Sequence, residues 1–343
     1  MKKKLLSVVL TAVMAATVLT GCGSTDDGTA STTAGSAAQT EAAASTDGKV
    51  YNIGICQLVE HEALDAATQG FQDALKEKLG DNVKFDLQNA QGEQTTAATI
   101  CNGFVSDGVD LILANATSPL QSAAAATTSI PILGTSVTDY ATALEISDWS
   151  GATGRNISGT SDLAPIEEQE AMLKELFPDV KQVGLLYCSA EANSLYQIQL
   201  FEAALDKDGI AYKEYAIADT NEVQSVTTAA AGECDVLYIP TDNTLASVTE
   251  TVYNVVAPAK VPVIAGEEGI CNGCGVATLS ISYYDLGYQT GEMAAAILTG
   301  SKDVSEMEIQ YAPAVTKKYN PTLCEKLNIT VPDDYEAIDM SAE

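Results

Sequence analysis

The sequence predicts an α/β fold built from two doubly wound parallel-sheet lobes. Strand-like and helix-like segments alternate along the chain, and this alternation is seen twice. The strands are short apolar runs rich in β-branched residues and leucine, which is typical of parallel sheets covered on both faces. The body that follows the N-terminal region is roughly 295 residues long, which is enough for two domains of common size.

The first half begins with an apolar strand at 50–58. The following helix, 64–79, has apolar residues at helical spacing, among them Leu64, Phe71 and Leu75, and ends before Gly80. Strands are then expected at 83–87, 110–116 and 131–137, and helices at 95–105 and 119–127.

The second half continues the same pattern. A short extended segment is expected at 156–159, and longer strands at 180–187, 210–217, 234–239, 261–265 and 276–282. Helices are expected at 165–176, 192–206, 221–230, 245–256, 284–298 and 321–327, and an extended segment at 307–315. Two parallel-sheet units in one chain imply a cleft between them.

The N-terminal region indicates export. Residues 2–4 are lysines, and 5–19 is an apolar stretch too short to span a bilayer comfortably. The sequence that ends in Cys22 resembles the lipobox of bacterial lipoproteins, which implies a signal peptide at 1–21 and a diacylated Cys22. Two acyl chains hold a protein stably on a membrane. Residues 22–48 form a flexible tether, so we expect an extracytoplasmic protein anchored to the cell membrane by its lipid.

The charge excludes one class of partner. The chain has 17 Lys and Arg against 47 Asp and Glu, a net charge of −30. A protein this acidic is repelled by phosphate backbones, so nucleic acid is not expected as a partner. The sequence contains neither a phosphate-binding loop nor a dinucleotide fingerprint, and no cofactor is expected.

Ligands of parallel sheets bind beyond the carboxyl ends of the strands. Ser, Thr, Asn, Asp and Glu follow nearly every predicted strand of this chain. These residue types also cap helices, and capping alone explains any single loop about as well as ligand binding does. The candidate ligand-binding residues are Gln57, Glu60, His61, Ala116, Thr117, Ser118, Thr138, Asp139, Tyr140, Ser161, Asp162, Glu191, Asn193, Ser194, Thr241, Asp242, Asn243 and Glu267.

Several short motifs in a fixed order resemble the tryptophan/tyrosine-type ABC-transporter substrate-binding lipoproteins. The resemblance covers 50 to about 332 and is carried by Ile53-Gly54-Ile55, Gln57-Leu58-Val59-Glu60-His61, Ala116-Thr117-Ser118-Pro119, Asn156-Ile157-Ser158-Gly159-Thr160-Ser161-Asp162, Glu191-Ala192-Asn193-Ser194, Pro240-Thr241-Asp242-Asn243-Thr244 and Gly291-Glu292-Met293-Ala294. Many members have Pro where this chain has Glu62 and Tyr140. The segment 138–155 also differs, and it holds the chain's only Trp and only Arg, Trp149 and Arg155.

The resemblance implies a type I periplasmic-binding-protein fold with a hinge of three crossing strands. The crossings are expected near 151–156, near Tyr283 and near 302–307. Lobe one would then comprise 49–154 plus 283–302, and lobe two 155–282 plus 303–343. The implied function is capture of a small ligand, an aromatic amino acid such as Trp, Tyr or Phe, by hinge closure. The implied partner is an ABC permease, and a monomer is expected.

An amino acid ligand would need an anionic acceptor for its ammonium group and donors for its carboxylate. Asp139, Asp162, Glu191 and Asp242 are candidate acceptors. Hydroxyls at helix N-termini can supply the donors, namely Thr117, Ser118, Ser161 and Ser194. Tyr140, Trp149 and Tyr187 could contact an aromatic ring, although each is better explained as core or hinge packing.

Two alternatives stay open. The same fold could bind a sugar or nucleoside, although few aromatic residues and one Arg disfavour a sugar. An extracellular hydrolytic enzyme is a weaker alternative, because His61 is the only His and the chain contains no Gly-x-Ser-x-Gly motif.

Seven cysteines remain besides Cys22. Five of them, Cys56, Cys101, Cys188, Cys234 and Cys324, lie in strand or helix patterns and are interpreted as small buried apolar residues. The pair Cys271 and Cys274 is expected on a loop. It could form a local disulfide, stay as free thiols or take part in metal or redox chemistry; no metal site is expected, since no further ligands are near in sequence.

Overall fold

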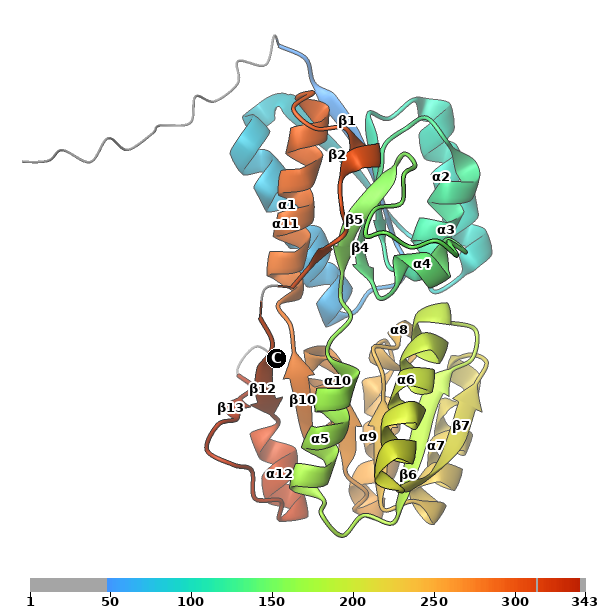
Figure 1. Ribbon diagram of the computed structural model, residues 1–343, viewed down its shortest axis with the longest axis vertical. Helices are drawn as coiled ribbons and strands as arrows, with labels where there is room; N and C mark the ends of the chain where they lie inside the picture. The colour runs from blue at the N-terminus through green and yellow to red at the C-terminus, as the bar shows by residue number, and fades with distance from the viewer. Residues whose placement is uncertain (1–47, 313, 340–343) are drawn as a thin grey trace, which may run out of the picture. The chain divides into compact units, whose positions relative to one another are not determined.

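The structure is a computed structural model that describes residues 48–312 and 314–339 (Figure 1). The predicted signal peptide, Cys22 and all but the end of the predicted tether lie outside these residues. The described residues form two β-sheets, each covered by helices, as the sequence predicts.

The first sheet is parallel throughout and has the order β11-β5-β4-β3-β1-β2. Its strands are β1 (Tyr51–Gln57), β2 (Val83–Asn89), β3 (Leu111–Asn115), β4 (Ile132–Val137), β5 (Ile157–Ser161) and β11 (Gln310–Tyr311). β3 and β4 are buried along their whole length, which explains their continuous apolar sequences.

Two groups of helices cover this sheet. One face packs against α1 (Glu62–Leu79) and α11 (Tyr283–Leu298). The other packs against α2 (Gln94–Asp107), α3 (Thr117–Ala126) and the short α4 (Tyr140–Ala143). The 3-10 turns η1 (Gly80–Asn82) and η3 (Val304–Glu306) follow α1 and α11.

The second sheet has the order β13-β12-β10-β9-β8-β6-β7. Its strands are β6 (Gln182–Cys188), β7 (Ala211–Ile217), β8 (Val236–Ile239), β9 (Val263–Ala265), β10 (Ala277–Ser280), β12 (Thr316–Tyr319) and β13 (Glu336–Ala337). β12 is antiparallel to β10, because the chain re-enters this sheet from the first lobe.

The helices of the second lobe bury two apolar clusters against the sheet. They are α5 (Ile166–Leu176), α6 (Ala192–Asp208), α7 (Val223–Glu233), which follows the 3-10 turn η2 (Thr220–Glu222), α8 (Asn243–Ala246), α9 (Thr249–Ala259), α10 (Glu268–Cys274) and α12 (Pro321–Leu327). The predicted helix 245–256 is therefore divided between α8 and α9. Cys271 and Cys274 lie on α10 and not on a loop, so that expectation was wrong.

The chain passes between the sheets after β5, after β10 and after β11. This finding corrects two of the predicted boundaries, because residues 155 onward and 303 onward were assigned to the second lobe. β5 pairs with β4, and β11 pairs with β5. Ile157 and Ile309 are buried in the apolar cluster of the first lobe, which holds both segments there.

The contact between α1 and α11 brings two helix backbones together (Figure 1). Glycines make this approach feasible. A Cβ atom added to Gly287 would lie 1.9 Å from the carbonyl oxygen of Ala67, and one added to Gly70 would lie 2.1 Å from that of Tyr284. Gly291 is similarly close to Phe71. The pair thus fastens residues 283–298 to a lobe whose other α-helices come from residues 62–143.

We expect Gly287→Ala to lower the free energy of unfolding by about 2–3 kcal/mol, because the methyl group would separate two backbones. Tm should fall by roughly 5–10 °C in a calorimetric scan. Gly103→Ala is the matched control: Gly103 is an exposed glycine of α2 with no atom within 4 Å of an added Cβ. It should raise stability by about 0.5–1 kcal/mol, since alanine favours helix. Equal effects of the two substitutions would contradict the packing argument.

Candidate functional site

A cavity of about 350 Å³ lies between the loops that follow the strands of the two sheets. The first lobe contributes residues that follow β1, β2 and β3, and the second lobe contributes residues that follow β6, β7 and β8. We call this cavity the cleft cavity. Its lining residues are Leu58, Val59, Gln91, Gly92, Glu93, Gln94, Thr117, Ser118, Gln121, Cys188, Ala190, Glu191, Ala192, Asn193, Ala218, Asp219, Thr220, Asn243, Thr244 and Ser247.

The N-terminus of α3 forms one wall of the cleft cavity. The preceding residue, Ala116, has no side chain that could cap the helix, and its φ of 96° is unusual for a residue other than glycine. The hydroxyl oxygens of Thr117 and Ser118 are buried and have no hydrogen-bond partner. An uncapped helix N-terminus with free hydroxyl groups attracts an anion, because the first backbone N–H groups and the helix dipole are uncompensated.

Glu191 forms the opposite wall, on the second lobe. Its carboxylate accepts hydrogen bonds from the backbone and side chains of Asn243 and Thr244, and from the side chain of Asn193. These bonds fix the start of α8 against the start of α6. The cleft cavity has no Lys, Arg or His among its lining residues, whereas Glu93 and Asp219 add further carboxylates. This negative wall would stabilise a cationic group of a ligand.

Side chains of the two lobes also contact each other beside the cleft. The Nε2 atom of His61, just before α1, lies 3.2 Å from Oδ1 of Asn243. The amide of Gln197 donates to the Thr138 hydroxyl at 3.5 Å. Burial lowers the pKa of His61, although the hydrogen bond with Asn243 and the charges of Glu191 and Asp65 act in the opposite direction. These contacts exist only while the lobes lie together.

Asp242 has the bonding pattern of a structural cap. Its carboxylate accepts from the backbone N–H groups of Cys188 and Leu245 and from the hydroxyl of Ser194. Burial, assisted by the nearby charge of Glu191, raises the pKa of Asp242 to about 7. All three donors come from the second lobe, so Asp242 holds the strand ends of that lobe together.

Asp162 lies where the chain leaves β5 for the second lobe. It accepts hydrogen bonds from the hydroxyls of Thr138 and Tyr283, at 3.0 and 2.9 Å. Burial raises the pKa of Asp162 above its ordinary value. The three residues come from separate segments, and the contact therefore ties one crossing of the chain to the start of α11.

Other predicted site residues are engaged within the protein. Gln57 bonds Asp65 and Thr68, and the Ser161 hydroxyl donates to the carbonyl oxygen of Thr138. Asp139 caps α4. Of the eighteen predicted residues, those that line the cleft cavity are Thr117, Ser118, Glu191, Asn193 and Asn243.

The three aromatic candidates pack in or against the cores of the lobes, as the preferred core-packing explanation expected. Tyr140 is buried in the core of the first lobe, where its ring adjoins Gly134 and Gly159 and its hydroxyl donates to the carbonyl oxygen of Thr160. Trp149 packs against the same core. Tyr187 belongs to a core cluster of the second lobe and bonds Glu214. None of the three lines the cleft cavity.

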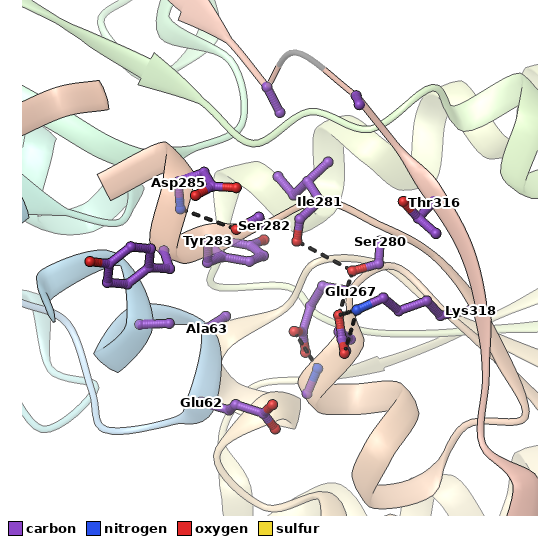
Figure 2. A pocket seen from close by; sticks show the side chains of 16 residues that line it. Glu62, Ala63, Glu267, Ser280, Ile281, Ser282, Tyr283, Asp285, Thr316 and Lys318 are labelled. Carbon is purple, nitrogen blue, oxygen red and sulfur yellow. Dashed lines mark hydrogen bonds and ion pairs between the residues drawn. The ribbon is translucent and has the colours of Figure 1, made fainter. Parts of the chain in front are cut away.

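Glu267 lies at a different cavity, of about 370 Å³, beside the segments that join the lobes (Figure 2). It caps α10 by accepting from the backbone of Gly269 and Ile270, and burial raises its pKa to about 7. The neighbouring Glu268 is paired with Lys318 at 2.7 Å. Residues that follow strands also line this cavity, namely Glu267 after β9 and Ile281 after β10. Its one lining cation, Lys318, is already paired, whereas the hydroxyls of Thr117 and Ser118 at the cleft cavity have no partner, so we favour the cleft cavity as the ligand site.

Sequence reasoning missed several lining residues. Gln91 to Gln94 follow β2, and Ala218 to Thr220 follow β7. Their signal is the same as for the other candidates, since they too lie just beyond the carboxyl ends of parallel strands. Thr244 directly follows the candidate Asn243 and was omitted, and Ser247 was missed because it was expected inside an undivided helix 245–256.

No helix among residues 48–312 and 314–339 has the length and apolar character needed to cross a membrane. Within the same residues, no group of three or more His, Cys, Asp and Glu side chains is arranged to hold a metal ion.

Comparison with known proteins identifies the family. Residues 52–341 match the ABC transporter substrate binding protein family. The chain is 38% identical over 310 residues to a tyrosine-binding protein of Clostridioides difficile, covering 90% of this chain and 87% of that protein.

Two solved structures are also similar. One is a Streptococcus pneumoniae ABC domain in complex with L-Trp, at 32% identity and a TM-score of 0.79, covering 83% of this chain and 97% of that one. The other is a ligand-free, open substrate-binding protein with adhesive properties from Clostridium difficile, at 37% identity and a TM-score of 0.65, covering 84% and 99%. These relatives are binding proteins and not enzymes. The strand-end cavity between two parallel-sheet lobes, together with the match over most of the sequence, shows that this chain belongs to the ABC transporter substrate-binding protein family, whose members work outside the cytoplasm.

Proposed function

We propose that this protein captures an aromatic amino acid, such as Trp, Tyr or Phe, in the cleft cavity and delivers it to an ABC importer. The observation that carries the proposal is the uncapped N-terminus of α3, where the free hydroxyls of Thr117 and Ser118 meet the cavity. A ligand carboxylate would accept hydrogen bonds from these hydroxyls and from the first backbone N–H groups of the helix.

The opposite wall suits the ammonium group. Glu191 lines the cleft cavity and carries a negative charge that no Lys or Arg among the lining residues offsets. The two walls belong to different lobes. A ligand with charges of both signs would therefore be held fully only when the lobes close on it.

The volume and lining of the cavity fit a small ligand. Its 350 Å³ lies in the range of roughly 300–1,000 Å³ typical of ligand pockets. Leu58 and Val59 supply an apolar surface on the first lobe, against which a side-chain ring could pack. The tyrosine-binding relative and the relative in complex with L-Trp support an aromatic side chain.

Hinge closure is the proposed mechanism. The higher TM-score with the L-Trp complex, at lower sequence identity than the open structure, supports a closed arrangement of the lobes here. The contacts of His61 with Asn243 and of Gln197 with Thr138 would be lost on opening. The closed form is the one that the permease would recognise.

The anchor completes the proposal. Diacylation of Cys22 would hold the protein on the outer face of the cell membrane, and the tether 22–48 would let the binding body reach the permease. We propose that the protein acts as a monomer, since the ligand site is complete within one chain.

The α3 wall can be tested by calorimetric titration with Trp, Tyr and Phe. We expect Ser118→Ala to weaken the binding of an aromatic amino acid roughly tenfold or more, because a hydrogen bond to a charged group contributes about 1.5–3 kcal/mol. Thr117→Val should act in the same direction. Ser122→Ala is the control, because Ser122 is a buried, unpartnered serine of the same helix that does not line the cavity. Binding of a sugar or nucleoside, with no heat from any amino acid, would refute the proposed ligand.

Closure should also depend on pH through His61. Burial in the closed form lowers the pKa of His61, so the open form binds a proton more tightly. Lowering the pH from 7.5 to 5.5 should therefore weaken ligand affinity, by about three- to tenfold for one coupled proton.

The matched variant is His61→Gln, which keeps an amide donor for Asn243 and cannot titrate. Its affinity, measured by fluorescence or calorimetry over the same range, should change less with pH than that of the unsubstituted protein. An identical pH profile for the two proteins would show that His61 does not sense closure.

A further inference from the structure

Gln121 is a polar residue of the cleft cavity that has no role in the proposed contacts with the ligand's carboxylate and ammonium groups. It lies on α3, three residues after Ser118. Helix positions three apart lie on the same side and are separated by about 4.5 Å along the axis. Gln121 is therefore one helical turn from the proposed carboxylate site, close enough to contact the ring of the same ligand.

One hydrogen bond fixes the orientation of the Gln121 amide. Its Nε2 atom donates to the carbonyl oxygen of Ala143, on α4, at 3.1 Å. A carbonyl oxygen can only accept a hydrogen bond, so the amide nitrogen is committed to α4 and Oε1 is the free end of the amide. Within residues 48–312 and 314–339 this is the one hydrogen bond of the Gln121 side chain, so Oε1 can accept from a ligand.

Most other polar side chains of the cleft cavity differ from Gln121 in one of two ways. Four belong to the second-lobe wall, which is proposed to hold the ammonium group, and donate hydrogen bonds there, namely Asn193, Asn243, Thr244 and Ser247. Others are exposed and stay hydrated whether or not a ligand bonds them, namely Gln91, Glu93, Gln94, Asp219 and Thr220. Gln121 is half-buried, and a half-buried acceptor loses more than an exposed one when its hydrogen bond is not made.

The apolar surface beside Gln121 suits an aromatic ring. Leu58 and Val59 line the cleft cavity, and the N–H of Leu58 donates to the carbonyl oxygen of Asn115, two residues before α3 begins. This bond places Leu58 beside the first turn of α3. A ring whose face packs on Leu58 and Val59 presents its edge to the neighbouring side chains. The donors of phenol and indole rings lie at that edge.

We propose that Gln121 determines which aromatic ring the protein accepts. Its Oε1 atom accepts a hydrogen bond from the phenol O–H of a Tyr ligand or the indole N–H of a Trp ligand. A Phe ligand has no such donor and leaves Oε1 without a partner. The inference rests on the proposed function, and it narrows the ligand class to aromatic amino acids with a hydrogen-bond donor on the ring.

The test compares L-Tyr with L-Phe, which differ by one hydroxyl group, in calorimetric titrations. A site that hydrogen-bonds a polar group of its ligand rejects the analogue that lacks the group. We expect the unsubstituted protein to bind L-Tyr at least roughly tenfold more tightly than L-Phe. In Gln121→Met, which keeps the length of the side chain and lacks the amide, the ratio should fall to about threefold or less. Gln121→Leu replaces this variant if it does not fold.

Gln121→Glu is the matched control, because it keeps an acceptor and loses the donor to Ala143. Its charge, close to the proposed carboxylate site, should weaken both ligands, but the ratio of the two affinities should stay near that of the unsubstituted protein. If Gln121→Glu lost the preference for L-Tyr as fully as Gln121→Met, the amide would act by positioning α4, and the proposed contact with the ring would be wrong.

Two further outcomes separate this inference from the proposed function. Equal affinities of the unsubstituted protein for L-Tyr and L-Phe would overturn the role of Gln121 and leave an aromatic amino acid as the ligand. The absence of binding by L-Trp, L-Tyr and L-Phe would overturn both.

Discussion

The close approach of α1 and α11 is the contact on which the arrangement of this protein depends. Gly70, Gly287 and Gly291 let the two helix backbones meet, and residues 283–298 thereby belong to a lobe formed mainly by residues 51–161. Because α11 packs in the first lobe but follows β10 in sequence, the chain must leave the first sheet after β5, form most of the second sheet and then return to the first lobe. The crossings at the hinge, and the cleft that they border, follow from this contact.

Electrostatics give the cleft its chemical character. Glu191, Asp242, Asp162 and Glu267 lie at or near the junction of the lobes, and the pKa values of the last three are raised chiefly by burial. Most of their oxygens are satisfied by backbone N–H groups or hydroxyls and not by cations. These hydrogen bonds fix the loops in place, while the raised pKa values favour the neutral forms of the three buried groups. The negative field at the cleft cavity therefore comes from its lining carboxylates Glu93, Glu191 and Asp219, and a ligand with a positive charge can enter it.

Much of the fold could be predicted because the helices are amphipathic and the strands are continuous apolar runs. α6 begins and α11 ends where the sequence indicated. The lobe boundaries were less accurate, because β5 and β11 are short and nothing in a short extended segment tells which sheet it joins. Cys271 and Cys274 were expected on a loop because Asn272 and Gly273 resemble a turn, but buried contacts of Ile270, Cys271 and Cys274 stabilise a helix there.

The candidate site was predictable in location and less so in detail. Strand ends identified Thr117, Ser118 and Glu191, because topology alone brings those loops together. The sequence could not distinguish residues that line the cavity from residues whose hydrogen bonds fix the surrounding loops in position. Asp242 and Ser194 bond each other inside the second lobe, and only three-dimensional contacts reveal that role. Tyr140 was a candidate by its position after a strand, but core packing was its preferred explanation, and its ring fills the space over two glycines.

The interlaced path of the chain also bears on how the protein is made. The first lobe lacks a covering helix and an edge strand until 283–311 has been synthesised, and the second sheet lacks β12 until 316–319 has followed. Neither lobe can finish folding while most of the chain is still emerging from the ribosome. A polypeptide that must be threaded across a membrane before it folds gains from this delay, because its last fifth completes both lobes on the far side.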